Sequence, residues 1–488
     1  MDRRDFGKRS IVLGMGVLGG RTASGGRPDN ASGDESHYEE PPKRLPVRRF
    51  DVVVAGAGTA GVVAAIAAAR QGAKVALIEQ KGYPGGTVTE GGTALHSFYN
   101  LYQAFNVEKR QVVRGIPQDI IDRLAGIGGT TGHAEMVKGV NYDSMCTAVD
   151  TEMYKLVTFE MLAEAGVFVA VNTLLVGAIV DNGSIRGVIT ESRSGREAVY
   201  ARSFVDSTAY GDLSAFAGAR YTEPNDYPVV NSAGMANVSI DRLYDYLQSH
   251  NAVSQLARGN RSGSDNQIVR VQGETVRLPE GFHKGAGEIG MSMVTTTVHD
   301  NYFMFIKFNL KLPVSPTNRD AVAVAELELR RRQARGVDLF RKYVPGFEKA
   351  FIARTSPSLN IRRARLIECD YDISHEDVLQ GRHFDDEVMV YGFHDSAPRF
   401  QVKGGGTYGI PYRAMLVKGI ENLYATGMMI TSDHEAHMST RNTVCSMGQG
   451  QGAGTAAALC AQRNCGSREL AYGQLRDALV KGNVCFDA

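Results

Sequence analysis

Three glycines at a fixed spacing mark the segment of this sequence whose chemistry is easiest to identify. Gly56, Gly58 and Gly61 form a Gly-x-Gly-x-x-Gly run directly after an apolar, β-branched segment. Such glycines permit a tight turn, let backbone N–H groups approach a pyrophosphate, and allow the following helix to pack closely on the strand. The N-terminus of that helix then stabilises the anion. The spacing predicts a phosphate-binding turn in which Thr59 and Ala60 also contact the ligand.

The elements that must position this turn follow one another in sequence. Residues 50–55 predict a buried parallel strand, the alanine-rich residues 62–71 a helix, and residues 74–78 a second strand. Glu79 ends the second strand, where a carboxylate can accept hydrogen bonds from ribose hydroxyls, and Gln80 follows it. We interpret this βαβ unit as a dinucleotide site. An ordinary βαβ unit with a glycine-rich turn is the alternative.

The next segment favours FAD over NAD. A nicotinamide-binding Rossmann domain normally continues into a helix and a third strand. This chain instead enters a glycine-rich loop over residues 81–92, which contains Gly86 and Thr87. Such a loop suits backbone laid along an extended dinucleotide towards its flavin end, and a flexible surface loop is the alternative. The pattern resembles the FAD-dependent oxidoreductase superfamily that includes the fumarate reductase and succinate dehydrogenase flavoproteins.

A later motif supports the resemblance. Residues 168–205 predict a β-meander, and Asp206 and Thr208 follow it at positions that match a superfamily motif. Ala209 and Tyr210 depart from that motif, which puts the detail of the loop in doubt. By resemblance, we assign the two matching residues to the cofactor site.

A glycine- and alanine-rich run near the C-terminus predicts a helix from about residue 445 to residue 462. Its N-terminal dipole would point at the flavin edge that becomes negative on reduction. A face without bulky side chains would let the helix touch the ring, which assigns Gly450, Gly452 and Ala453 to the cofactor. Gly427, at the end of a preceding strand, is assigned with them. A packed contact between two Gly/Ala helices is the alternative.

This tail, with residues 379–386 and 409–416, is similar to a bacterial family of FAD-dependent oxidoreductases, some of which are labelled xanthan lyase-like. The similarity covers roughly residues 49–465 and is weak over 225–340. It implies noncovalent FAD but no particular substrate. The expected fold is α/β: a Rossmann-like FAD-binding domain, with a parallel sheet and a β-meander, and an inserted α+β substrate domain.

We divide the chain into four parts. They are an export signal and linker (1–47), the first part of the FAD-binding domain (48–212), a substrate or cap domain (213–400), and the C-terminal part of the FAD-binding domain (401–488).

The substrate part has its own local patterns. Residues 239–250 and 320–343 predict helices, and residues 291–299 and 302–308 predict strands. Residues 251–290 are rich in Gly, Asn and Ser, and we interpret them as a lid or a mobile excursion.

Flavin chemistry needs a substrate carbon over the ring, a group that moves a proton, and fixed donors that hold developing charge. His394 and His434 are the candidates for the proton, because histidine titrates near neutral pH. Arg362 and Arg441 are the candidates for orienting a carboxylate or hydroxyl group. A structural role is the alternative for each histidine, and a solvated surface strand is the alternative for Arg362.

The functional hypothesis is an FAD-dependent oxidoreductase that transfers a hydride between flavin N5 and a small polar substrate, either a sugar-like alcohol or an organic acid. A redox-neutral elimination or isomerisation with bound FAD, and a noncatalytic flavin-binding protein, are the alternatives. The balance of 54 Lys and Arg against 53 Asp and Glu argues against nucleic acid as a partner. Six cysteines without a Cys-x-x-Cys pair predict no metal site.

The N-terminus resembles a twin-arginine export signal. Arg3, Arg4, Phe6 and Lys8 precede a mildly apolar stretch over residues 10–20. That stretch is too short to span a bilayer, which needs about 20 apolar residues, and no later stretch predicts a membrane span. We expect the twin-arginine translocase to export the folded protein to the periplasm or beyond; a disordered basic tail is the alternative. Because NADH is scarce outside the cytoplasm, we expect a quinone, a cytochrome or a small carrier as the electron acceptor.

Overall fold

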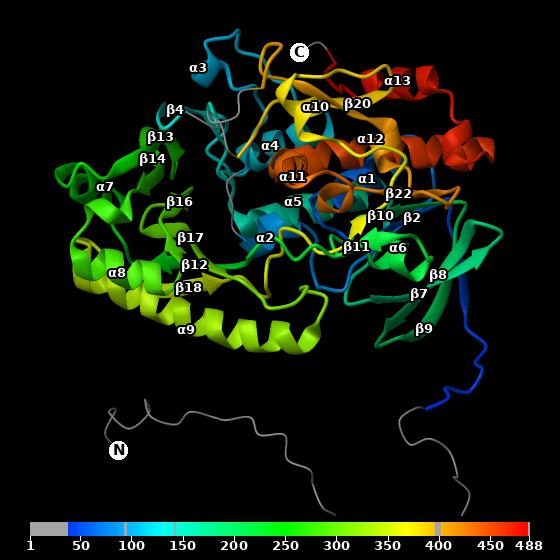
Figure 1. Cartoon of the computed structure of the whole chain (residues 1–488), viewed down its shortest axis with the longest axis horizontal. Coiled ribbons are helices and arrows are strands. Elements are labelled where there is room, and N and C mark those ends of the chain that lie inside the picture. Colours follow the sequence, from blue (N-terminus) through cyan, green and yellow to red (C-terminus); the bar gives the residue numbers. More distant parts are fainter. Residues whose placement is uncertain (1–37, 92–94, 141–142, 396–401, 487–488) are drawn as a thin grey trace, which may run out of the picture. The chain divides into compact units, whose positions relative to one another are not determined.

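The computed structural model describes residues 38–91, 95–140, 143–395 and 402–486 (Figure 1). The predicted export motif falls in residues 1–37 and so lies outside the described residues. The chain separates into Met1–Arg44 and a compact unit over Leu45–Ala488, and the fold is that of the second unit.

A five-stranded parallel sheet carries the predicted dinucleotide turn. Except for the edge strand β6, its strands are fully buried, and the central β2 and β3 are unbroken runs of Val, Ile, Leu and Ala, as burial on both faces favours. The sheet brings residues from four distant parts of the chain to one carboxyl edge. Its order is β22 (Leu423–Ala425), β10 (Ser203–Asp206), β2 (Val52–Ala55), β3 (Val75–Ile78) and β6 (Phe168–Ala170).

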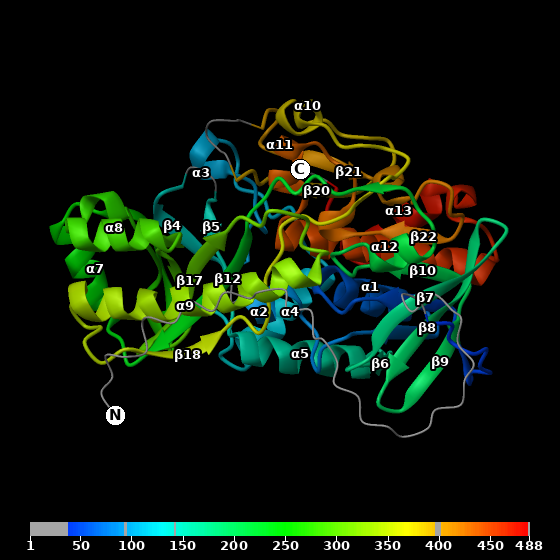
Figure 2. The ribbon, with the colours of Figure 1, turned by 60° about the horizontal axis from the view of Figure 1, so that its bottom comes forward.

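Two helices lie side by side against this sheet, α1 (Thr59–Arg70) and α12 (Thr443–Arg463), as both ribbon views show (Figures 1 and 2). Their backbones come very close. A Cβ atom added to Gly450 would lie 2.2 Å from the carbonyl oxygen of Ala60, and one added to Gly454 would lie 2.1 Å from that of Ala64. The glycines of α12 therefore allow it to pack directly on the helix of the phosphate-binding turn.

The β-meander forms a separate sheet. Asn182 and Gly183, both with positive φ, make the two-residue turn between its strands β7 and β8, as the sequence predicts. The first and last strands predicted for the meander, β6 and β10, belong instead to the parallel sheet. The order of the meander sheet is β1 (Val47–Arg49), β9 (Gly195–Tyr200), β8 (Ser184–Ser192) and β7 (Leu174–Asp181).

The inserted part contains two further sheets. A four-stranded antiparallel sheet packs on the long helix α9 (Arg319–Tyr343). Its order is β15 (Met291–Ser292), β17 (Tyr302–Leu310), β12 (Val229–Ala236) and β18 (Phe351–Thr355). A five-stranded antiparallel sheet has the order β16 (Val294–Thr296), β14 (Ser264–Gly273), β13 (Val253–Arg261), β4 (Ala134–Lys138) and β5 (Met145–Cys146).

The second of these sheets corrects one expectation. Residues 251–290 form the β13–β14 hairpin and the helix α8 (Glu280–Glu288), so the prediction of a lid is wrong. Ser262 and Gly263, both with positive φ, make the hairpin turn, so part of the Gly and Ser content serves this turn. The sheet also takes β4 and β5 from the range 48–212, ahead of the predicted start of the substrate part.

Shorter elements connect these layers. The remaining helices are α2 (Thr87–Gly91), α3 (Tyr102–Phe105), α4 (Ile116–Gly126), α5 (Thr151–Glu164), α6 (Asp212–Phe216), α7 (Ile240–Ser249), α10 (His375–Leu379), α11 (His434–Thr440) and α13 (Tyr472–Lys481). The remaining strands are β11 (Tyr221–Thr222) with β19 (Leu366–Ile367), and β20 (Glu387–Tyr391) with β21 (Tyr408–Pro411).

Two kinds of feature are absent from the part of the chain that the structure describes. None of its helices combines the length and the hydropathy needed to cross a membrane. Within the same residues, no three His, Cys, Asp or Glu side chains come together as ligands for a metal ion.

Candidate functional site

A cavity of about 610 Å³ opens at the carboxyl edge of the parallel sheet. Ligands of open α/β sheets bind at this edge, where loops from neighbouring strands diverge. Most residues that the sequence assigns to the cofactor line this cavity. They are Gly56, Gly58, Thr59, Ala60, Glu79, Gln80, Gly86, Thr87, Thr208 and Gly427.

The glycine-rich turn at the end of β2 has the shape of a phosphate cradle. Gly56 has a φ of +87°, and a Cβ atom there would lie 2.5 Å from the carbonyl oxygen of Ser207. A Cβ atom on Gly61 would lie 1.8 Å from the carbonyl oxygen of Gly56, so this glycine serves packing and does not line the cavity. The N-cap Gly58 supplies no side chain to cap α1, and the first turn holds no acidic residue. The uncapped N–H groups at this end of the helix favour an anion.

Glu79 lies partly buried at the end of β3 and is held in place by two backbone amides. Its Oε2 accepts a hydrogen bond from the N–H of Ala57 at 2.7 Å, and its Oε1 accepts one from the N–H of Lys81 at 2.8 Å. Burial raises the pKa of Glu79, and these two amides act against the rise. Each carboxylate oxygen retains acceptor capacity for a ribose hydroxyl group.

Asp206 stabilises a loop of the cavity wall through hydrogen bonds. It is fully buried and does not line the cavity. Its carboxylate accepts hydrogen bonds from the N–H and hydroxyl groups of Thr208 and of Ser214 at 2.7 to 3.1 Å. This network fixes the loop that carries Thr208 to the cavity wall. Ala209, where the related motif has a glycine, has a φ of +65°. The loop therefore keeps a left-handed conformation despite the departure from the motif.

Helix α12 reaches the cavity with its first turns and not with its glycine-rich face. α12 begins at Thr443, two residues before the expected start, and Ser446 lines the cavity. Gly450 faces Ala60 of α1, a Cβ atom on Gly452 would lie 2.9 Å from Cβ of Val388, and Ala453 is buried; none of the three lines the cavity. Gly450 thus makes the helix–helix contact considered as the alternative above.

Several lining residues carry no signal that the sequence alone could reveal. The inserted part contributes Arg319, Ser358, Asn360, Ile361 and Arg365, and Tyr210 precedes it. Lys81 and Glu90 also line the cavity and form an ion pair there. These residues follow no spacing rule, and several come from the middle of the chain, so only the tertiary fold identifies them.

The four predicted catalytic residues do not line the cavity. Three of them gather around Tyr227. The guanidinium carbon of Arg441 lies 5.7 Å from the centre of the Tyr227 ring, and the ring of His434 stacks on it at 4.6 Å. Arg362 interacts electrostatically with both Tyr227 and Arg441. The structure therefore brings together residues that are far apart in the sequence.

The two histidines differ in environment. His434 keeps 44% of its side chain exposed, and its Nδ1 lies 2.8 Å from Oδ2 of Asp226. His394 is fully buried, with its Nε2 3.1 Å from the carbonyl oxygen of Glu435. Burial lowers the pKa of His394, so its imidazole is held neutral. A ring nitrogen that binds a carbonyl oxygen must donate, which directs the proton of His394 to Nε2.

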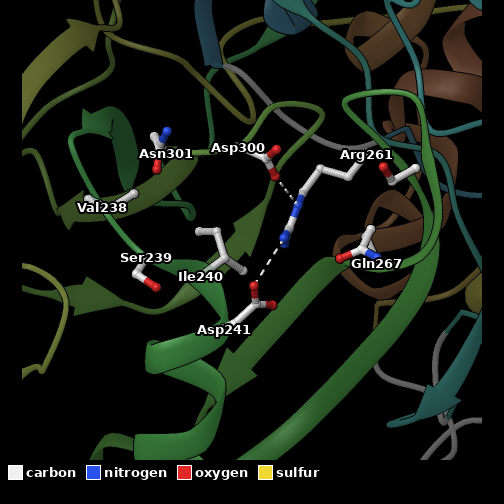
Figure 3. Close-up of a pocket in the computed structure, with 9 residues that line it drawn as sticks. Val238, Ser239, Ile240, Asp241, Arg261, Gln267, Asp300 and Asn301 are labelled. Carbon is white, nitrogen blue, oxygen red and sulfur yellow. Dashed lines mark hydrogen bonds and ion pairs between the residues drawn. The ribbon is translucent and has the colours of Figure 1, made fainter.

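A second cavity, of about 390 Å³, lies in the inserted part (Figure 3). Asp241 and Asp300 point at the buried Arg261 there, and its guanidinium donates to them at 3.3 Å and 2.8 Å. A third donor of the same group binds the carbonyl oxygen of Ile268 at 3.0 Å. Arg261 therefore pairs with both carboxylates at the centre of this cavity, and we assign the cavity a structural role.

Comparisons with known proteins agree with this geometry. The sequence model of a protein family described as FAD dependent oxidoreductase matches residues 51–479. A curated relative, 3-oxosteroid 1-dehydrogenase of Mycobacterium tuberculosis (strain ATCC 25618 / H37Rv), is 34% identical over 93 residues. The aligned segment covers 19% of this chain and 16% of that relative. The relative therefore resembles this chain over a short part of its own length.

Solved structures of low sequence identity also align over most of the chain. A geranylgeranyl bacteriochlorophyll reductase-like protein of Thermoplasma acidophilum is 14% identical, covers 90% of this chain and 84% of its own, and has a TM-score of 0.45. For the myxobacterial chondrochloren halogenase these values are 11%, 88%, 78% and 0.46. For L-proline dehydrogenase of P. horikoshii they are 12%, 86%, 95% and 0.39. We assign the fold from the strand order of this chain itself.

Proposed function

Because the chain belongs to the family of FAD dependent oxidoreductases, we propose that it is a dehydrogenase-type flavoenzyme acting on a small polar organic substrate, a sugar-like alcohol or an organic acid. Bound FAD supplies the two-electron chemistry, with hydride exchanged between flavin N5 and a substrate carbon. The observation that carries the proposal is the cavity at the sheet edge, where an uncapped helix N-terminus and the fixed carboxylate of Glu79 stand together.

The residues of the cavity fit FAD. The N-terminal amides of α1 would hold the pyrophosphate, and Glu79 would accept from the adenosine ribose. A Cβ atom on Gly86 would lie 2.7 Å from Cα of Gly58, so the second glycine-rich loop lies against the phosphate turn. Ser446, near the start of α12, would meet the flavin end. These contacts support the binding mode expected from the sequence.

On the substrate side, we assign proton transfer to His434. It is partly exposed and oriented by Asp226, whereas the Nε2 of the buried His394 is occupied by a backbone carbonyl. Arg362 and Arg441, which both interact with Tyr227, would orient the substrate through its acidic or hydroxyl groups. A histidine that moves a proton typically contributes a factor of about 100 to 10,000 to the rate.

We further propose that the protein is exported folded by the twin-arginine translocase and works in the periplasm or outside the cell. The Arg3-Arg4 motif supports this location. A quinone, a cytochrome or a small carrier would then reoxidise the flavin. Fractionation of cells that express the full chain tests the location: the double variant Arg3→Lys/Arg4→Lys should stay in the cytoplasm, and equal export of both forms would refute it.

The function itself is tested by anaerobic reduction of the purified holoprotein. A panel of sugars, hydroxy acids and amines is added, and the loss of the visible flavin band is followed. We expect at least one sugar or acid to bleach the flavin and a quinone or cytochrome to restore it. Substrate turnover without a net redox change would favour elimination or isomerisation instead, and no reaction at all would favour a noncatalytic flavin protein.

A further inference from the structure

Lys307, which has no role in the predictions from the sequence, lies in the same region as Arg362 and Arg441. Lys307 lies in the middle of β17, directly opposite Ser232 of β12 and Ser292 of β15. Directly opposed residues of an antiparallel pair project from the same face of the sheet. The hydroxyl of Ser232 donates to the carbonyl oxygen of Gly91, at the end of α2. Lys307 therefore leaves the sheet on the same face as Ser232, towards α2, whose Glu90 lines the main cavity.

Two arginines from other parts of the chain, Arg362 and Arg441, interact electrostatically with Lys307. Arg362 directly follows the cavity-lining Ile361, and its guanidinium makes no hydrogen bond or ion pair with any described residue. Arg441 ends α11 and forms an ion pair with Asp395, while its buried Nε has no partner among the described residues. The neighbouring Arg363 differs, because it is paired with Asp226 at 2.7 Å. Arg362 therefore has no paired carboxylate among the described residues, and Arg441 keeps one unused donor.

The charges around Lys307 do not balance. Burial lowers the pKa of the Lys307 amine to about 8 and that of Arg362 to about 10, and nearby cations add to both shifts. Arg270, on β14, also interacts electrostatically with the lysine, so three arginines lower its pKa and the carboxylate of Asp395 acts against them. Tyr227 contributes no charge near neutral pH, because burial raises its pKa to about 12. Partly buried cations in excess of their counter-ions are costly unless an anion joins them.

We propose that Lys307, Arg362 and Arg441 form the binding site for the carboxylate of an organic acid substrate. The inference rests on the proposed function and narrows its substrate class, since a neutral sugar would leave the cations uncompensated. The two guanidinium groups can bind a carboxylate through paired N–H donors, and the lysine adds a point charge. None of the three residues is closed off completely from the surface, since each falls in the partly buried class. Lys307 is thus assigned as a third substrate-binding residue.

The test compares acids with their isosteric amides on the FAD-loaded enzyme. Succinate with succinamide, lactate with lactamide, and inorganic phosphate are titrated, and binding is followed by the change in the flavin spectrum and by the thermal midpoint. We expect at least one acid to bind and its amide to bind about 10- to 100-fold more weakly, as for loss of hydrogen bonds to a charged group. Equal binding of acids and amides, or binding of phosphate alone, would overturn the proposal.

Variants of Lys307 and of a control lysine distinguish a role of Lys307 in binding from a general effect of losing a lysine. Lys307→Gln should weaken acid binding about 10-fold or more, and Lys307→Arg should restore it. Lys284→Gln, on the exposed face of α8 in the same inserted part, is the matched control and should bind as the wild type does. Equal affinity of Lys307→Gln and Lys284→Gln would refute the assignment.

A second measurement covers the case in which Lys307→Gln fails to fold. Lysines of the wild-type enzyme are acetylated near pH 8 with and without the acid, and Lys307 is quantified by mass spectrometry. We expect the acid to protect Lys307 and not Lys284, and equal protection would count against the site. An enzyme that a neutral sugar reduces and that ignores every acid overturns this inference alone, whereas a chain that binds no FAD overturns the proposed function first.

Discussion

The contact between α1 and α12 makes a quantitative prediction about Gly450. Replacement by alanine would place a Cβ atom 2.2 Å from the carbonyl oxygen of Ala60, whereas ordinary contacts begin near 3.4 Å. The obstacle is backbone, so it cannot rotate away as a flexible side chain could. The two helices must therefore separate by about 1 Å along a buried interface.

The free energy of unfolding follows from two opposing effects. Overpacking of a filled core costs about 1 to 3 kcal/mol, occasionally more. Alanine is favoured over glycine in a helix by about 1 kcal/mol. With a carbonyl as close as that of Ala60, we expect the clash to dominate and the Gly450→Ala variant to lose about 2 kcal/mol of stability. Because Ala60 also lines the cavity, the displaced α1 should retain FAD less well.

The assay is urea denaturation of the apoprotein, together with equilibrium dialysis of FAD. Gly473→Ala is the matched control: this glycine is exposed in α13, and a Cβ atom there meets nothing within 4 Å. The control should gain up to about 1 kcal/mol and bind FAD normally. If Gly450→Ala is as stable as Gly473→Ala and retains FAD equally, the close approach of the two helices is wrong.

Three further predictions follow from single residues. Glu79→Gln replaces an acceptor with a donor opposite the amide of Ala57 or Lys81, so it should weaken FAD binding by about 1 to 3 kcal/mol, measured by dialysis; unchanged affinity would contradict the role of the carboxylate. Ala209→Gly relieves a φ of +65° and should raise the free energy of unfolding by about 1 kcal/mol, whereas a loss would argue against the left-handed turn. The pKa of Lys307 is lowered from 10.5 to about 8, so between these values the unfolded chain binds a proton that the folded chain does not. Relative to Lys307→Met, the wild type should therefore gain about 1 kcal/mol of stability per pH unit from pH 8 towards pH 10.5, with a constant difference below that window; a flat difference across it would contradict the burial of the amine.

Local patterns predicted the dinucleotide half well. The strand, glycine turn, helix and second strand lie within a few residues of their predicted limits, because each depends on neighbours in sequence: β-branched runs, an alanine-rich helix and glycines with positive φ. The pairing of β4 with β13 joins residues more than a hundred positions apart, and no local period encodes it. Composition also misled where turn residues of a hairpin suggested a lid.

The candidate site also contains residues that the sequence predicted and residues that only the fold brings together. The cavity-lining residues at strand ends were predictable because the carboxyl ends of parallel strands meet at one edge. The sequence prediction placed Gly450 against the flavin ring, whereas it packs against Ala60 of α1. A helix of small residues can pack against a ring or against another helix, so its composition does not distinguish the two. Lys307 has no motif around it; its signal is a charge within the otherwise apolar run of β17. Only the fold reveals that this charge interacts electrostatically with Arg362 and Arg441.

The most direct measurement is the visible spectrum of the purified chain before and after anaerobic addition of the substrate panel. The account predicts one noncovalent FAD per chain, released on denaturation, and bleaching by at least one small polar substrate. A chain that remains colourless after incubation with FAD would contradict the assignment of the cavity at Gly56–Glu79, and with it the function proposed for this protein.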